Sequence, residues 1–356
     1  MKRCVLHIGM HKTGSSSIQA SLQNFSSRDF RYAHLLRTPN HSGAICLAFS
    51  KRPQIYTDEK SSRSQTKLGR RIRAKLTNQL ERSNSSTLII SGEGISKLRL
   101  EELETLYTFI SKYVSEVEVV CYVRSTKSYI ESALQQRIKS GLSSFDPATF
   151  YPHYRSRFEK FDLVFGREKV RFWEFKPQTL KGGCVVTDFC ARLGVDLAPE
   201  KIIRKNDSLS AEALSLLYTY QKYRSESSEP ININTKSYDA LLQSLSRLKG
   251  KKLKLSPKII NPLLLRYKED MDWMAKRLGS TLTPPEASLA APMVESESDL
   301  LRPSRAALSW LIAQTAPNDS HSVNEEFADE NISRTVSQYM HKLVERTAYA
   351  VPAIPS

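Results

Sequence analysis

The sequence feature that most constrains the fold is a short apolar run that leads through a glycine- and serine-containing loop into a helical pattern. The segment reads VLHIGMHKTGSSSIQ over residues 5–19. In such a unit the strand fixes the direction of the loop, and the glycines let backbone N–H groups point toward a bound anion. The N-terminus of the following helix carries the positive end of its dipole, which also attracts an anion. Lys12 adds a full charge. The pattern predicts a strand–loop–helix unit that binds a phosphate-like anion.

The spacing distinguishes this loop from two common nucleotide-binding loops. In the nucleotide triphosphatase loop, G-x-x-x-x-G-K-[ST], the lysine directly follows the second glycine. Here Lys12 precedes Gly14 by two residues. A dinucleotide-binding loop needs G-x-G-x-x-G, but Gly9 and Gly14 are the only glycines of the segment. An ordinary turn with a solvated lysine is the alternative, although it gives no reason for the serine triplet.

Residues 11–17, HKTGSSS, resemble the 5′-phosphosulfate-binding loop of the sulfotransferases, whose usual form is P-K-[TS]-G-T-T before a helix. These enzymes transfer a sulfuryl group from 3′-phosphoadenosine 5′-phosphosulfate (PAPS), and their fold is similar to that of the P-loop NTPases. This chain has His11 where the family usually has proline. The resemblance implies that PAPS is held by Lys12, Thr13, Gly14, Ser15, Ser16 and Ser17.

A second signature lies much further along the chain. Residues 118–123, EVVCYV, form an apolar, β-branched run that predicts a buried strand, and a helical pattern follows Arg124. The guanidinium of Arg124 can bind a phosphate through two donors, and Ser132 lies two turns along the helix. In sulfotransferases an arginine at a strand end and a serine eight residues later bind the 3′-phosphate. The resemblance implies this role for Arg124 and Ser132, while a surface ion pair is the alternative for Arg124 taken alone.

Two weaker resemblances concern the base that deprotonates the acceptor. Glu93 follows the predicted strand at 87–91, and in bacterial and Golgi-type sulfotransferases a glutamate at a comparable strand end often has this role. His41 lies in a segment, PNHS, similar to one that follows the first helix in bacterial members, and it is an alternative base. A helix-start or solvent-facing carboxylate and a solvated loop histidine are the ordinary alternatives. His7 and His11 are weaker candidates for a catalytic part.

Two later segments also fit the family. Residues 170–175 predict a further strand, followed by a helix around 186–193. Arg204 and Lys205 precede a helix that starts near Ala211 with Ser210 as its cap. The resemblance places this region close to the nucleotide, so Arg204 and Lys205 are further candidates to hold the 3′-phosphate.

The whole-chain composition agrees with an anionic partner. The 356 residues include 53 Lys and Arg against 37 Asp and Glu, which gives a formal net charge of +16. A nucleotide donor fits this charge, as does an anionic polysaccharide or lipid. Nucleic acid fits by charge alone, but no common nucleic-acid-binding motif is visible, and we expect none as a partner.

The cysteines and the hydropathy pattern bear on the compartment. The five cysteines are scattered without a C-x-x-C pair, which argues against a disulfide framework and against zinc and favours a reducing compartment. No run reaches the roughly 18 apolar residues of a membrane span, and the first strand starts almost at once. We therefore expect a cytoplasmic, bacterial protein without a membrane anchor.

Alternating strand and helix patterns predict an α/β fold, a three-layer sandwich with a central parallel sheet of the P-loop-like sulfotransferase type. We place this domain at 1–225, with a basic insertion at 51–82 that is either a helix lining the acceptor cleft or a solvated basic face. A polar loop at 226–234 and a helical extension at 235–279 follow. A flexible acidic linker is predicted at 280–300 and C-terminal helices, an appendage to the domain, at 301–356.

The resemblance implies in-line displacement at sulfur. Lys12 neutralises charge on the bridging oxygen, Arg124 and Ser132 select PAPS over ATP, and Glu93 takes the acceptor proton; no metal is expected. The acceptor is a hydroxyl or amine, with a carbohydrate or glycolipid as the expectation of the family, and the oligomeric state stays open. Two other function classes are possible. A phosphotransferase would require a Walker-type lysine and a Mg²⁺-binding aspartate at a strand end. A non-enzymatic polyanion or nucleic-acid binder would lose affinity steeply as the salt concentration rises.

Overall fold

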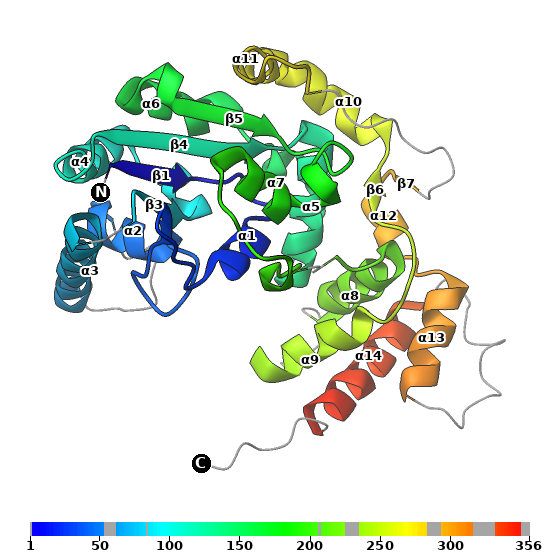
Figure 1. Cartoon of the computed structure of the whole chain (residues 1–356). Coiled ribbons are helices and arrows are strands. Elements are labelled where there is room, and N and C mark those ends of the chain that lie inside the picture. The colour runs from blue at the N-terminus through cyan, green and yellow to red at the C-terminus, as the bar shows by residue number, and fades with distance from the viewer. Residues whose placement is uncertain are drawn as a thin grey trace. The chain divides into compact units, whose positions relative to one another are not determined.

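The computed structural model describes residues 2–52, 62–82, 85–205, 208–224, 235–282, 293–315 and 332–349. The chain divides into two compact units, each assembled from separate stretches of sequence (Figure 1). Unit 1 comprises residues 1–126, 152–205 and 267–283, and unit 2 comprises residues 127–151, 206–266 and 284–356.

Unit 1 contains a five-stranded parallel sheet in the order β2-β3-β1-β4-β5. Its strands are β1 (Arg3–His7), β2 (Phe30–Tyr32), β3 (Thr87–Ser91), β4 (Glu116–Val123) and β5 (Val170–Glu174). The inner strands are almost wholly buried on both faces, as expected of a parallel sheet covered by helices. The predicted α/β fold with a central parallel sheet is therefore confirmed, although the three-residue β2 was not predicted.

Unit 1 also contains helices, several of which pack against the sheet. They are α1 (Ser15–Leu22), α2 (Ser42–Phe49), α3 (Ser62–Arg82), α4 (Leu100–Ile110), α6 (Tyr154–Phe165), α7 (Val185–Leu193) and α11 (Lys268–Leu278). Short 3₁₀ turns are η2 (Glu93–Lys97), η4 (Arg167–Lys169), η5 (Lys181–Gly183) and η6 (Pro199–Lys201). Ile18 of α1 and Phe189 of α7 share one core cluster with Val5 of β1 and Tyr122 of β4.

The predicted basic insertion contains α3. Its apolar residues Ile72, Leu76 and Leu80 are buried at helical spacing, and the helix packs against α2. Lys67 and Arg71 are exposed on the opposite side. Residues 53–61 of the insertion lie outside the described residues.

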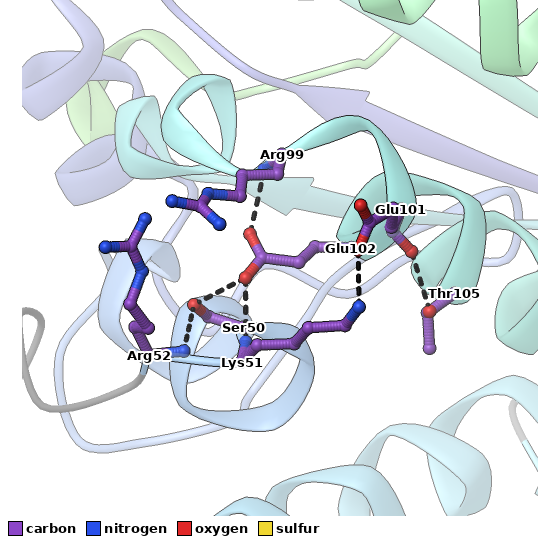
Figure 2. Close-up of polar contacts among 7 residues, drawn as sticks. All are labelled: Ser50, Lys51, Arg52, Arg99, Glu101, Glu102 and Thr105. Carbon is purple, nitrogen blue, oxygen red and sulfur yellow. Dashed lines mark hydrogen bonds and ion pairs between the residues drawn. The ribbon is translucent and has the colours of Figure 1, made fainter.

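Glu102 holds the end of α2 to the start of α4 (Figure 2). Its Oε2 accepts a hydrogen bond from the backbone N–H of Arg99 at 2.8 Å, so Glu102 caps its own helix from the third position. Its Oε1 accepts from the Lys51 backbone at 2.7 Å and from Ser50 Oγ at 3.0 Å. Both carboxylate oxygens therefore fix the backbone.

Unit 2 is mainly helical. It contains nearly all of α5 (Thr126–Lys139), then η3 (Pro147–Phe150), α8 (Ala211–Arg224), α9 (Thr235–Leu245), α10 (Pro257–Arg266), α12 (Glu297–Leu300), α13 (Arg305–Thr315) and α14 (Ile332–Tyr349), with a short parallel pair of β6 (Lys254–Leu255) and β7 (Met293–Val294). Ser210 Oγ accepts from the N–H of Ala213 at 3.1 Å, which confirms the predicted cap of α8. The carboxylate of Glu131 pairs with Lys127 at 2.9 Å and Lys254 at 3.1 Å.

The predicted segments map onto these units as follows. The extension at 235–279 contributes α9, β6 and α10 to unit 2 and α11 to unit 1. Residues 293–300 of the predicted linker form β7 and α12, whereas its residues 283–292 and the predicted loop at 226–234 lie outside the described residues. The proposed domain boundaries stay predictions.

Candidate active site

The loop between β1 and α1 leaves the sheet at its centre. From β1 the chain crosses to the edge strand β2, whereas from β3 it passes over β1 to reach β4 and then β5. The connections that leave the adjacent parallel strands β1 and β3 therefore go in opposite directions. In α/β proteins such a point lies beside the ligand-binding crevice at the carboxyl ends of the strands. Residues 8–14 lie beside such a crevice, which places the predicted anion-binding loop at a favourable point of the fold.

The backbone of this loop is shaped by three residues in left-handed conformations: Gly9 at φ 37°, Lys12 at φ 68° and Gly14 at φ 78°. Only glycine adopts this region without strain, so the Lys12 conformation needs support from its surroundings. Thr13 gives part of it, since its Oγ1 donates to the carbonyl of Met10 at 2.6 Å. A Cβ on Gly14 would come within 2.6 Å of Val185, so glycine is also required there for space.

Helix α1 starts at the end of this loop without a side-chain cap. The carbonyl of Gly14 accepts from the N–H groups of Ser17 at 3.0 Å and Ile18 at 3.2 Å. In the described part of the chain, the N–H groups of Ser15 and Ser16 have no acceptor. Ser15 is buried, and its hydroxyl also lacks a partner there. A negatively charged group would satisfy these donors and interact with the helix dipole, as sequence analysis predicts.

Arg124 contacts this loop directly. Its Nη1 donates to the carbonyl of Lys12 at 2.8 Å, and its backbone N–H lies 3.4 Å from Met10 Sδ. Tyr154 fixes the backbone at the end of β4, because its hydroxyl donates to the Arg124 carbonyl at 2.7 Å. The guanidinium lies 5.6 Å from the ring centre of Phe175, within cation–π range. The two sequence signatures therefore meet at one place.

The other candidates for the 3′-phosphate are placed less closely. Ser132 belongs to unit 2, so its pairing with Arg124 stays a prediction. The segment before residue 206 runs along α1: the backbone N–H of Lys205 donates to Ser17 Oγ at 3.1 Å, and that of Ile203 to Ser21 Oγ at 2.8 Å. The side chains of Arg204 and Lys205 are exposed.

Glu93 begins η2, directly after β3, and is 8% exposed. Its Oε2 accepts hydrogen bonds from Gln19 Nε2 at 3.2 Å and from Asn40 Nδ2 at 3.1 Å. No residue in the described ranges donates to its Oε1. The carboxylate thus has one oxygen held by two amides and one oxygen left to accept a proton.

His41 does not fit the role of an alternative base. Its Nδ1 accepts from the backbone N–H of Ser91 at 3.1 Å, and its Nε2 donates to the carbonyl of Ala33 at 2.8 Å. Burial lowers the pKa of His41 to about 4, although the hydrogen bond to Ala33 acts in the opposite direction. Both ring nitrogens are used to join the backbones after β2 and β3, so we assign His41 a structural role.

Two further histidines lie near Glu93. His7 Nδ1 is 2.8 Å from Ser91 Oγ, and its Nε2 is buried without a hydrogen-bond partner among the described residues. Burial lowers the pKa of His7 to about 4 against the attraction of Glu93. Burial also lowers the pKa of His11, with Glu93 raising it and Lys97, Arg157 and Lys12 lowering it further. Both rings are therefore neutral at pH 7.

The remaining expectations concern metals, thiols and membranes. Within the ranges that the structure describes, no group of three or more His, Cys, Asp or Glu residues is arranged to hold a metal ion. All five cysteines are buried and no disulfide joins them. No described helix combines the length and the apolar character that crossing a membrane requires.

Comparisons with known proteins give limited matches. No protein-family model matches the chain. An uncharacterized protein of Archaeoglobus fulgidus is 28% identical over 130 residues, so the match spans only 35% of this chain and 35% of that protein. Among solved structures, a sulfotransferase from Alicyclobacillus acidocaldarius is 14% identical, with a TM-score of 0.36, covering 64% of this chain and 95% of that chain. The structural resemblance is weak, and the argument for function rests on the site.

Sequence reasoning missed several residues of this site. Gln19 and Asn40 hold Glu93, and Phe175 and Tyr154 support Arg124. One signal was available: Gln19 is a polar residue four positions after Ser15, which places both on one face of α1.

Proposed function

We propose that this protein is a sulfotransferase that transfers a sulfuryl group from PAPS to a hydroxyl-bearing acceptor. The observation that carries the proposal is the hydrogen bond from Arg124 to the carbonyl of Lys12. It joins two signatures that resemble separate phosphate-binding elements of one enzyme family, and it does so beside a helix start with unsatisfied donors. A lone phosphate loop would fit many enzymes, whereas this pairing fits a nucleotide with phosphate groups at both ends.

The residues present fit such a donor. The N–H groups of Ser15 and Ser16, the start of α1 and Lys12 would hold the 5′-phosphosulfate, while Arg124 would bind the 3′-phosphate with Ser132, Arg204 and Lys205 as further candidates. The bound donor supplies an electrophilic sulfur and a phosphate leaving group. Lys12 of the same loop would offset charge on the leaving oxygen.

Glu93 is proposed as the base. The acceptor hydroxyl gives its proton to Glu93 Oε1 as its oxygen bonds to sulfur, and the bridging S–O bond breaks to leave adenosine 3′,5′-bisphosphate. Its burial beside the loop gives the carboxylate a position close to the reacting groups. A carbohydrate or glycolipid is the acceptor class that we propose, and the scattered cysteines favour a cytoplasmic location.

Calorimetric binding of adenosine 3′,5′-bisphosphate tests the proposal without an acceptor. We expect micromolar binding that exceeds the binding of ADP or of ATP with Mg²⁺ and that falls at least tenfold in Arg124→Ala and Lys12→Ala. Arg71→Ala removes an exposed cation of α3 and serves as the matched control for net charge. Preference for ATP with Mg²⁺ would indicate a phosphotransferase, and equal, salt-sensitive binding of all three would indicate a polyanion binder.

A further inference from the structure

A buried polar network joins Glu93 to the helix that carries the anion-binding loop. Gln19 lies on α1, and its Nε2 donates to Glu93 Oε2 at 3.2 Å and to Ser91 Oγ at 3.3 Å. Because a carboxylate can only accept, the amide must present its NH₂ group to Glu93. Gln19 is 2% exposed, and Ser91 is fully buried. The two N–H bonds of one side chain thus reach two residues at the end of β3.

Gly9 lets these elements approach each other. A Cβ at Gly9 would lie 2.6 Å from Ser15 Oγ and 3.1 Å from Glu93 Cγ. The end of β1, the first turn of α1 and the Glu93 side chain therefore meet at one small space, which only glycine permits. Any movement of α1 relative to β3 would change the Gln19–Glu93 contact.

Asn40 completes the arrangement from the other side. Its Nδ2 donates to the same Oε2 at 3.1 Å, while its Oδ1 accepts from the N–H of Ser42 at 2.9 Å and fixes the orientation of the amide. Two neutral donors on one oxygen stabilise the ionised carboxylate and orient its plane. Its second oxygen, Oε1, is the one that remains to accept from a ligand.

We propose that Gln19 is a positioning residue that couples the anion-binding helix α1 to Glu93, so that Oε2 is held and Oε1 is presented to the acceptor hydroxyl. This inference rests on the proposed function for its chemical role. Gln19 acts on the reaction through its hydrogen bond to Glu93. It sets the carboxylate at a fixed place relative to the helix that orients the donor, and correct placement of reacting groups contributes strongly to rate.

Other titratable groups interact electrostatically with the Glu93 carboxylate. They are His7 from β1, Tyr32 from β2, and His11 from the loop, with Lys12, Lys97 and Arg157 acting around His11. Burial raises the pKa of Tyr32, so this phenol stays neutral. Burial lowers the pKa of His11, and a His11→Asn background removes this imidazole and its interaction with Glu93.

Two variants of Gln19 separate positioning from folding. Gln19→Met keeps the length of the side chain and removes both donors, whereas Gln19→Glu keeps its shape and sets a second carboxyl beside Oε2. Gln65→Met is the matched control, since Gln65 is a buried glutamine of α3 at 4% exposure. Transfer of ³⁵S from labelled PAPS is measured with a panel of methyl glycosides, in both wild-type and His11→Asn backgrounds.

We expect kcat to fall at least tenfold in Gln19→Met while the KM for the acceptor and the affinity for adenosine 3′,5′-bisphosphate change less than threefold. The acidic limb of the pH profile of kcat/KM moves to higher pH in both variants, because Gln19→Met removes a donor from Oε2 and Gln19→Glu sets a second carboxyl beside it. Gln65→Met leaves the profile in place. An unshifted profile in both Gln19 variants, or an equal loss of kcat in Gln65→Met, would overturn the proposal.

A readout that needs no reaction separates this inference from the proposed function. In protein labelled with ¹⁵N-glutamine, the side-chain NH₂ signal of Gln19 should move with pH in wild type and lose this movement in Glu93→Gln. A signal independent of pH overturns the Gln19–Glu93 assignment, whatever reaction the enzyme catalyses. If the signal behaves as expected but neither adenosine 3′,5′-bisphosphate nor ADP binds, the contact stands and sulfuryl transfer is wrong.

Discussion

Glu93 and Glu102 are both buried, but their carboxylates have different hydrogen-bonding environments. Glu102 has both oxygens occupied, by the backbone of Arg99 and Lys51 and by Ser50 (Figure 2). Glu93 has one oxygen held by two side-chain amides and the other left open. A carboxylate whose two oxygens both accept hydrogen bonds from the protein stabilises the fold, whereas one with a single oxygen held is oriented and can still accept a proton. The two glutamates differ in the hydrogen bonds that each carboxylate accepts, whereas both side chains are buried.

Replacing Lys12 of the loop or Lys51 beside Glu102 by alanine gives the largest expected contrast. Lys12→Ala should lower the rate of sulfuryl transfer about 10²–10³-fold, because it removes a cation from the site where charge develops. Lys51, which pairs with Glu101 at the surface, should be replaceable by alanine without change in rate or in melting temperature. Single-turnover transfer and thermal unfolding of both variants check this, and near-normal turnover of Lys12→Ala would contradict it.

Glu102→Gln should destabilise the fold without touching the chemistry. An amide in place of the carboxylate turns an NH₂ group toward a backbone donor and leaves it unpaired, at a cost of about 2 kcal/mol. Urea unfolding at pH 7 measures the loss, with Glu104→Gln on the exposed side of α4 as the control. Unchanged stability would show that the three hydrogen bonds contribute nothing.

The effect of Glu102 should depend on pH in a defined direction. Burial opposes its ionisation, but the hydrogen bonds from Arg99, Lys51 and Ser50 outweigh it and hold the pKa of Glu102 below its usual range. A carboxyl with a lowered folded pKa stabilises the protein fully above the pKa of the unfolded chain, about 4.3, and loses this contribution as pH falls through the folded pKa. Wild type and Glu102→Gln should therefore converge in unfolding free energy as pH falls below the pKa of the unfolded chain and through the lowered folded pKa. A constant difference across the range would argue against ionisation as the source.

The smallest contrast concerns the individual donors. Ser50→Ala removes one of three donors from Glu102 and should cost about 1 kcal/mol of stability with no change in rate. Asn40→Ala removes one of two donors from Glu93 and should lower kcat severalfold. Its loss of unfolding free energy should be similar to that of Ser50→Ala, about 1 kcal/mol. Urea unfolding and initial-rate kinetics on the same samples test the pair, and a slower Ser50→Ala enzyme would remove the distinction between the two glutamates.

The sequence was sufficient for most of the sheet and for the strand–loop–helix unit at residues 3–22 because both are local. Apolar runs at 5–8, 87–90, 118–123 and 170–175 fall on β1, β3, β4 and β5. The loop could be read because glycine and lysine spacing determines where N–H groups and charge lie. The short strand β2 has too few residues for a period-two pattern and exists through its pairing with β3.

The residues around Glu93 could not be read in the same way, because their roles depend on register and packing. His7 and Ser91 are paired positions on β1 and β3, and this pairing appears only once the strands are aligned. In the segment at 39–42 the resemblance pointed to His41, but the turn directs Asn40 to Glu93 and uses both nitrogens of His41 to bind backbone. Local patterns could not show which side chain of this segment contacts Glu93.

The most direct test of the account compares Glu93→Gln with Glu102→Gln in the transfer of ³⁵S from labelled PAPS to the methyl glycoside that wild type uses fastest. At a temperature where both variants are folded, we predict that Glu93→Gln loses at least 10²-fold in kcat while Glu102→Gln keeps wild-type activity. Equal activity of wild type and Glu93→Gln, or an equal loss in both variants, would contradict the assignment of Glu93 as the base.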